Sequence, residues 1–138
     1  MIVTVLIFIG VAIIMHIISV RKMNEAINET NGIIRTYHHL NVVKEAINVN
    51  MKLAILYMVL FGILVVLLII KVMDGMPMTG AALALFLFGV ITFPVSLHGK
   101  KYENKIRNMK VEADDPQIAA KYQDYLKQWS GAAFQLRD

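Results

Sequence analysis

The chain contains no cysteine among its 138 residues. This absence excludes disulfide bonds, thiolate metal sites and cysteine nucleophiles. Acidic residues are missing from the three long apolar runs, which counts against a proton-driven pump or an ion-coupled transporter that works alone. The sequence has no serine–histidine–acid arrangement and no phosphate-cradling glycine loop, so it predicts that the protein is not an enzyme.

What the chain does have is an excess of apolar residues in long runs. Hydrophobic residues make up 57% of the chain and the mean hydropathy is +0.58, whereas soluble domains usually contain about 45–50% apolar residues. The runs at about 2–20, 53–71 and 78–97 are each long enough for a helix to cross ~30 Å of hydrocarbon. The sequence therefore predicts an all-α integral membrane protein with three transmembrane helices, forming a single module over residues 1–138.

The loop between the first two runs is also predicted to be helical. Residues 21–52 are too many for a simple turn, and Asn31-Gly32 is the best breaker because this dipeptide favours positive φ. The first helix should therefore continue to Thr30. A second helix should run from about Ile33 straight into the next span, so that the loop forms a helical hairpin.

The rest of the chain is predicted to be a transmembrane hairpin followed by a helical tail. The Asp74–Gly80 turn contains a proline and two glycines, so residues 53–97 should form two antiparallel spans. The tail, residues 98–138, should carry amphipathic helices at about 98–111 and 116–130. Asp115 suits the N-cap of the second helix and Pro116 its first position. Phe134 and Leu136, near the end of the tail, could dock on the rest of the chain.

The basic residues predict an orientation. Five lie in the 21–52 loop and five in residues 98–110, whereas the turn between the last two spans has only Lys71. The positive-inside rule therefore places the loop and the tail in the cytoplasm and the N-terminus outside. The expected location is the plasma membrane, the inner membrane of a bacterium.

Two sets of residues are candidate contacts with other proteins. The third span carries small residues and a proline, and small residues let helices approach closely; the candidates there are Gly80, Ala84, Gly89 and Pro94. The second tail helix carries Tyr122, Tyr125 and Trp129 on one face. That face must pack on the loop hairpin, on the membrane surface or on a partner, and with only Lys121 and Lys127 as basic residues on this helix, packing on a partner or self-packing is favoured over lipid.

A basic cluster follows the third span. It can contact anionic lipid headgroups, at about 1 kcal/mol per residue near the surface, or simply set the topology, and the second role ranks first. Nucleic-acid binding is not expected of so short a cluster beside a membrane. The cluster consists of Lys100, Lys101, Lys105, Arg107 and Lys110.

Histidines are the remaining candidates for chemistry. His16 is the one ionisable residue within a span, and His98 ends the third span, so the two could lie at similar depth and hold a haem or a metal between helices. The alternative, which is preferred, is that His16 snorkels or bonds to a neighbouring helix. His38 and His39 point about 100° apart on a helix and are read as solvated. No cofactor or metal is therefore expected.

The leading functional hypothesis is a non-enzymatic membrane subunit that acts through helix-mediated assembly. It would be a homo-oligomer or an accessory or scaffold subunit of a larger complex, with membrane lipids and itself or other membrane subunits as partners. One alternative is a component of an oligomeric channel or transporter, for which only Thr4, His16, Thr92 and Ser96 offer a polar stripe. A second alternative is a haem- or quinone-binding redox subunit.

Overall fold

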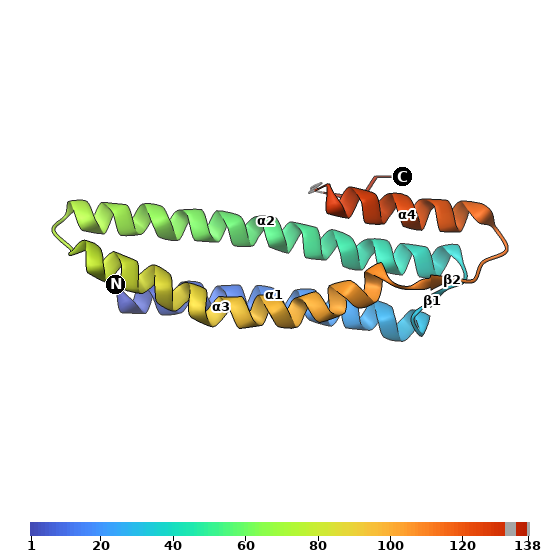
Figure 1. The fold of residues 1–138 in the computed structure, drawn as a ribbon, viewed down its shortest axis with the longest axis horizontal. Coiled ribbons are helices and arrows are strands. Elements are labelled where there is room, and N and C mark those ends of the chain that lie inside the picture. The colour runs from blue at the N-terminus through green and yellow to red at the C-terminus, as the bar shows by residue number, and fades with distance from the viewer. Residues whose placement is uncertain (132–134, 138) are drawn as a thin grey trace.

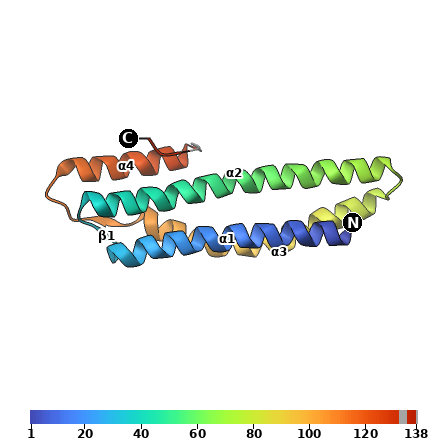
Figure 2. The same cartoon turned by 180° about the vertical axis from the view of Figure 1, so that it is seen from behind.

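A computed structural model describes residues 1–131 and 135–137. Within these residues the chain forms a long rod of helices with one short pair of strands (Figures 1 and 2). The elements are α1 (Ile2–Thr30), β1 (Ile33–Ile34), α2 (Tyr37–Met73), α3 (Met78–Arg107), β2 (Lys110–Val111) and α4 (Pro116–Ser130). Helices α1, α2 and α3 are each long and apolar enough to cross a membrane.

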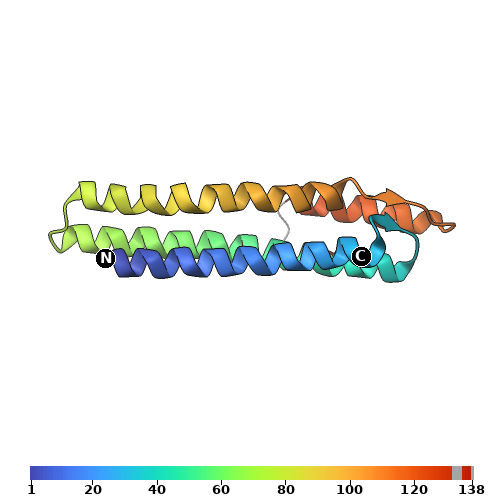
Figure 3. The same ribbon diagram turned by 90° about the horizontal axis from the view of Figure 1, so that it is seen from below.

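The three long helices run side by side along the rod (Figure 3). Helix α1 packs against both α2 and α3, whereas α2 and α3 contact each other much less. The α2–α3 turn and the N-terminus lie at one end, and the strands lie at the other (Figure 1). We call the end with the N-terminus the apolar half and the end with the strands the charged half. Helix α4 folds back along the charged half and packs on α2.

The long helices meet along stripes that alternate in steps of three and four residues. In α1 the buried positions include Val5, Ile9 and Ala12 in the apolar half and continue through Ser19 to Thr30 in the charged half. This spacing is the seam of a left-handed helix bundle, in which such a stripe stays on one side over many turns. The same face of α1 is therefore buried in both the apolar half and the charged half.

Two hydrophobic cores lie along this seam. The core of the apolar half comprises Val5, Ile9, Ala12, Leu64, Leu68 and Phe88. The larger core of the charged half is built from all four helices, and its largest buried side chains include Tyr122, Tyr125, Met23, Leu40, Ile47 and Ile106. The charged half is therefore a closed four-helix bundle, whereas the apolar half has three helices and most of its outer surface open.

Sequence reasoning predicted the elements well but not all of their ends. Helix α1 does continue to Thr30, and Asn31 and Gly32 both take positive φ, at 54° and 76°. Helix α2 begins at Tyr37 rather than near Ile33, because the Thr36 hydroxyl caps it by accepting from the His39 backbone N–H at 3.2 Å.

The separate helices expected at 78–97 and 98–111 are one helix. Helix α3 passes through Pro94 and across the change in polarity near His98 without a break, and it ends at Arg107. The chain then forms β2, which pairs with β1 in parallel through Ile33↔Lys110 and Ile34↔Val111. The Glu112 backbone N–H extends this pairing by donating to the Ile34 carbonyl at 2.9 Å. This pairing was not predicted, because it joins segments far apart in sequence.

Candidate functional site

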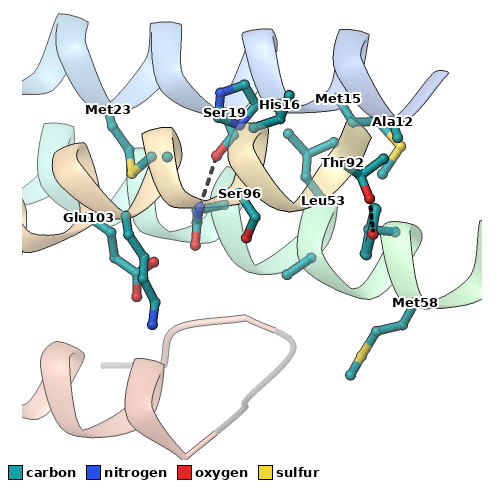
Figure 4. Close-up of a pocket in the computed structure, with 16 residues that line it drawn as sticks. Ala12, Met15, His16, Ser19, Met23, Leu53, Met58, Thr92, Ser96 and Glu103 are labelled. Carbon is teal, nitrogen blue, oxygen red and sulfur yellow. Dashed lines mark hydrogen bonds between the residues drawn. The ribbon is translucent and has the colours of Figure 1, made fainter. Parts of the chain in front are cut away.

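A cavity of about 420 Å³ lies between α1, α2 and α3 where the two halves meet (Figure 4). Its volume falls within the range of about 300–1,000 Å³ that is typical of small-molecule sites. Apolar side chains line the part toward the apolar half, among them Met15, Leu53 and Met58. Polar side chains line the part toward the charged half, among them Ser19, Asn50 and Ser96.

The sequence creates this hollow by placing small residues on all three helices at one level. The seam of α1 carries Ala12 and Ser19 there, α2 carries Ala54, and α3 carries Gly99. Along each helix, large buried side chains precede and follow these small residues. They are Ile47 and Leu64 on α2, and Phe88 and Ile106 on α3. Because large side chains resume above and below, the hollow is confined to this level.

A hydrogen-bonded chain closes the cavity toward the charged half. The Asn50 side-chain NH₂ group donates to the Ser19 hydroxyl at 2.9 Å, and the Asn50 side-chain oxygen Oδ1 accepts from the Trp129 indole N–H at 3.1 Å. These two bonds join α1, α2 and the last turn of α4. Figure 4 shows the Ser19 end of this chain within the cavity.

Arg107, on α3, adds contacts to Trp129 and Ser130 at the same end of the cavity. Its guanidinium lies 4.1 Å from the centre of the Trp129 ring, a cation–π contact. It also donates to Glu103 at 3.2 Å and to the Ser130 hydroxyl at 2.9 Å. Arg107 is thus committed to contacts within the chain and is only 28% exposed in its side chain.

A second polar contact marks the other end of the cavity. The hydroxyl groups of Tyr57 and Thr92 are 3.0 Å apart, and Thr92 also donates to the Phe88 carbonyl at 2.8 Å. The Tyr57 ring stacks on Phe88, with 5.9 Å between ring centres. Beyond these rings the apolar core is packed with aliphatic side chains, so the cavity ends here.

His16 and His98 form one wall. The His16 Nε2 and His98 Nδ1 atoms are 3.2 Å apart, so the two residues do lie at the same depth. This distance is that of a hydrogen bond between the two rings, whereas two axial imidazoles of a haem iron would need about 4 Å between their nitrogens, at ~2.0 Å per bond. No group of three or more histidine, cysteine, aspartate or glutamate side chains that could hold a metal ion occurs among the described residues.

The wall separates the cavity from a second hollow of about 580 Å³ on the outer side of α1 and α3. His16 lines both spaces, and His98 and Arg21 line the outer one. Gly99 makes room for the His16 ring, because a Cβ atom at this position would lie 3.0 Å from the His16 Cε1.

The candidate interface on α3 divides into two groups in the structure. Gly80 and Ala84 are half-buried, and Ala84 packs against the core of the apolar half. Gly89 and Pro94 are exposed, and nothing lies within 4 Å of the position that a Cβ of Gly89 would take. Only the second pair therefore faces outward.

The aromatic face of α4 is buried within the chain itself. Tyr122, Tyr125 and Trp129 are at most 7% exposed and belong to the core of the charged half. Tyr122 donates to the Ile106 carbonyl, and burial raises its pKa. Of the three packing alternatives, the structure therefore realises packing on the loop hairpin, so this face is covered within one chain. Leu136 is also buried and its N–H donates to Asn48 at 2.7 Å, while Phe134 lies outside the described residues.

The basic cluster after the third span is exposed except at one member. Lys100, Lys101, Lys105 and Lys110 are exposed, and Arg107 packs on Trp129 as described. Four side chains of the cluster are thus open to a headgroup. His38 is exposed as well and pairs with Glu29 at 2.8 Å.

Sequence reasoning did not single out Ser19, Asn50 or Gly99 as site residues. The signal that would have found them is their position in the helical stripes, where a small or polar residue interrupts a bulky series. Comparison with known proteins adds no further residue, because no family model, curated protein or solved structure matches the chain.

Proposed function

We propose that this protein is a non-enzymatic membrane subunit that acts by assembling with further copies of itself or with other membrane subunits. In this proposal α1, α2 and α3 cross the plasma membrane of a bacterium, with the N-terminus outside and the charged half in the cytoplasm. The basic residues of the charged half support that orientation.

The observation that carries the proposal is an outward stripe on α3. Ala82, Phe86, Gly89 and Phe93 are all exposed and follow one another in steps of four, three and four residues. Phe86 and Phe93 are 68% and 65% exposed. Small and aromatic residues alternate in this stripe, so that another helix could lie in the gap at Gly89 between two rings.

The apolar half, which carries this stripe, is a better candidate for contact with a partner than the charged half. The charged half is closed by α4 and its aromatic face is occupied. The apolar half has no fourth helix within the described residues, and its exposed side chains are large and apolar. A partner in the membrane therefore has an open surface, whereas a partner of the charged half would meet a polar one.

The same packing gives less support to a channel through one copy. Val5, Leu64 and Phe88 are at most 1% exposed and fill the axis of the apolar half. A water-filled path would need polar groups there. Any conduction would have to run between copies, which again requires assembly.

The test compares two exposed glycines in the membrane helices. Gly89→Leu fills the gap in the α3 stripe, and Gly62→Leu makes the same change on α2 where a Cβ also meets nothing within 4 Å. In native mass spectrometry after mild extraction, the unchanged protein should run in an assembly. Gly89→Leu should dissociate it and Gly62→Leu should not. A monomeric wild-type protein, or equal behaviour of the two variants, would contradict the proposal.

A further inference from the structure

The cavity continues a groove that α4 fills only in part. In the charged half α4 bridges α2 and α3, through Trp129 to Asn50 and through Ser130 to Arg107. Helix α4 ends at Ser130, at the level where the cavity begins. Beyond it no other described helix or strand lies along α2 and α3 on this side (Figure 1).

The cavity is open on this side. Four of its lining residues are exposed, and they come from α2 and α3 rather than from α1: Ala54, Met58, Ser96 and Lys100. Met58 is 72% exposed. An opening between two membrane-crossing helices faces the lipid, so that a molecule can enter sideways from the bilayer.

Polarity changes in order along this opening. Met58 and Ala54 lie toward the apolar half, Ser96 follows, and Lys100 lies one further turn toward the charged half. From Thr92 to Lys100 the helix rises roughly 12 Å, at 1.5 Å per residue. The series from apolar to hydroxyl to cation matches an amphiphile of the leaflet next to the charged half, with its tail beside Met58 and its head beside Lys100.

The charges select the head group. Lys100 makes no ion pair in the part of the chain that the structure describes, whereas Glu103 is neutralised by Arg107 at 3.2 Å. The net charge at the mouth is therefore positive. Ser19, Ser96 and Asn50 add hydrogen-bonding groups beside it.

We propose that this cavity binds one anionic membrane amphiphile, with its phosphate or carboxylate beside Lys100 and Ser96 and its apolar tail along Ala54 and Met58. The inference rests on membrane insertion of the three helices but not on the assembly of copies. A second copy of the chain fits the cavity poorly, because a helix is about 10–12 Å wide and the opening leads into a space lined by three helices.

The experiment uses the full-length protein in an uncharged detergent. Lysophosphatidylglycerol is added, and its binding is measured by native mass spectrometry and by the fluorescence of Trp129, the single tryptophan, which hydrogen-bonds to Asn50 at the end of the cavity. One molecule should bind per chain, and lysophosphatidylcholine should bind at least fivefold more weakly. Myristate and dioleoylphosphatidylglycerol, added separately, distinguish a fatty acid and a two-tailed phospholipid from a single-tailed one.

Two pairs of variants locate the binding. Lys100→Gln should weaken binding about fivefold, and Lys101→Gln, which removes the same charge beside the cavity, less than twofold. Ala54→Phe should block the mouth and abolish the one-to-one complex, and Gly62→Phe, which adds a ring on α2 where a Cβ meets nothing within 4 Å, should leave it intact. Equal effects of the two lysine variants, or unchanged binding to Ala54→Phe, would overturn the proposal. Equal binding of the zwitterionic lipid would overturn it as well.

Discussion

Trp129 and Asn50 are joined by a hydrogen bond of 3.1 Å that ties the last turn of α4 to the first half of α2. The same asparagine bonds to Ser19 on α1, so one side chain holds three helices together at the end of the cavity. Trp129 is only 7% exposed, so its indole N–H is shielded from water where it donates to Asn50.

Removing the Asn50 side chain should destabilise the charged half. Asn50→Leu leaves the indole N–H and the Ser19 hydroxyl without this partner, which costs about 1–3 kcal/mol of the free energy of unfolding. Denaturant unfolding in detergent, followed by Trp129 fluorescence, measures the loss. Asn41→Leu is the control, since Asn41 is exposed on the same helix. Equal stability of the two variants would contradict the role assigned to Asn50.

Acid should loosen α4 through Asp115. The Tyr37 hydroxyl, 2.6 Å from the carboxylate, and then the Gln117 backbone N–H at 2.9 Å hold the pKa of Asp115 below its usual value. The stability that this adds is fully present above the usual pKa of about 3.9 and is lost as the pH falls through the lower pKa of the folded state. Trp129 fluorescence across an acid titration should show the change.

The matched control for this titration is the neighbouring aspartate. Asp115→Asn keeps an N-capping residue but removes the charge, so its acid transition should be smaller than that of the wild-type protein. Asp114→Asn should leave the transition unchanged, because Asp114 has no side-chain hydrogen bond in the described structure. A transition that Asp115→Asn does not reduce would refute the assignment.

Gly99→Ala should disturb the histidine wall. Alanine is the better helix former by about 1 kcal/mol, but its Cβ would lie 3.0 Å from the His16 ring and displace it from His98. The midpoint of thermal unfolding should fall in this variant and should not fall in Gly89→Ala, where the Cβ meets nothing. In a His16→Ala background Gly99→Ala should become neutral or stabilising. A penalty that persists without His16 would show that another contact is responsible.

Gly32→Ala should destabilise the α1–α2 connection. Gly32 has φ of 76°, and a side chain in this region costs about 1–2 kcal/mol. Gly62→Ala, in the middle of α2, should be neutral or stabilising because its position is helical and open. Unfolding free energies in detergent compare the two, and an unchanged Gly32→Ala would argue against the left-handed turn.

The lack of cysteine offers a direct test of orientation. Asp74→Cys lies in the turn between α2 and α3, and Lys127→Cys lies on α4, and both positions are exposed. A membrane-impermeant maleimide should label Asp74→Cys in intact cells and Lys127→Cys only after the membrane is opened. The opposite pattern would invert the proposed topology.

Most of the helical architecture followed from the sequence, because long apolar runs and helix breakers act locally. The Asn31-Gly32 break and the Asp115 cap were both predicted and are both present. The continuity of α3 does not follow from the sequence pattern, because the change from apolar to basic residues near Lys100 ends the apolar run but does not break the backbone hydrogen bonds of the helix. The strand pair was missed because it depends on which segments the helices bring together.

The cavity was harder to predict for a related reason. Thr92, Ser96 and His16 were noted as polar residues within spans, but their partners on other helices depend on the relative register of α1, α2 and α3. That register is fixed by packing over the full length of the rod, from Val5 to Thr30 on α1. The sequence predicted that His16 and His98 could lie at similar depth, and in the structure their ring nitrogens are 3.2 Å apart.

The place of α4 in the chain order has a consequence for biosynthesis. Its buried aromatic residues complete a core whose other members come from the three long helices, and α4 follows all three in the chain. The long helices therefore leave the ribosome before the segment that covers them, and side chains such as Ile47 and Ile106 stay open to water until residues 116–130 have been made. A product truncated before α4 would present this apolar face to chaperones and proteases.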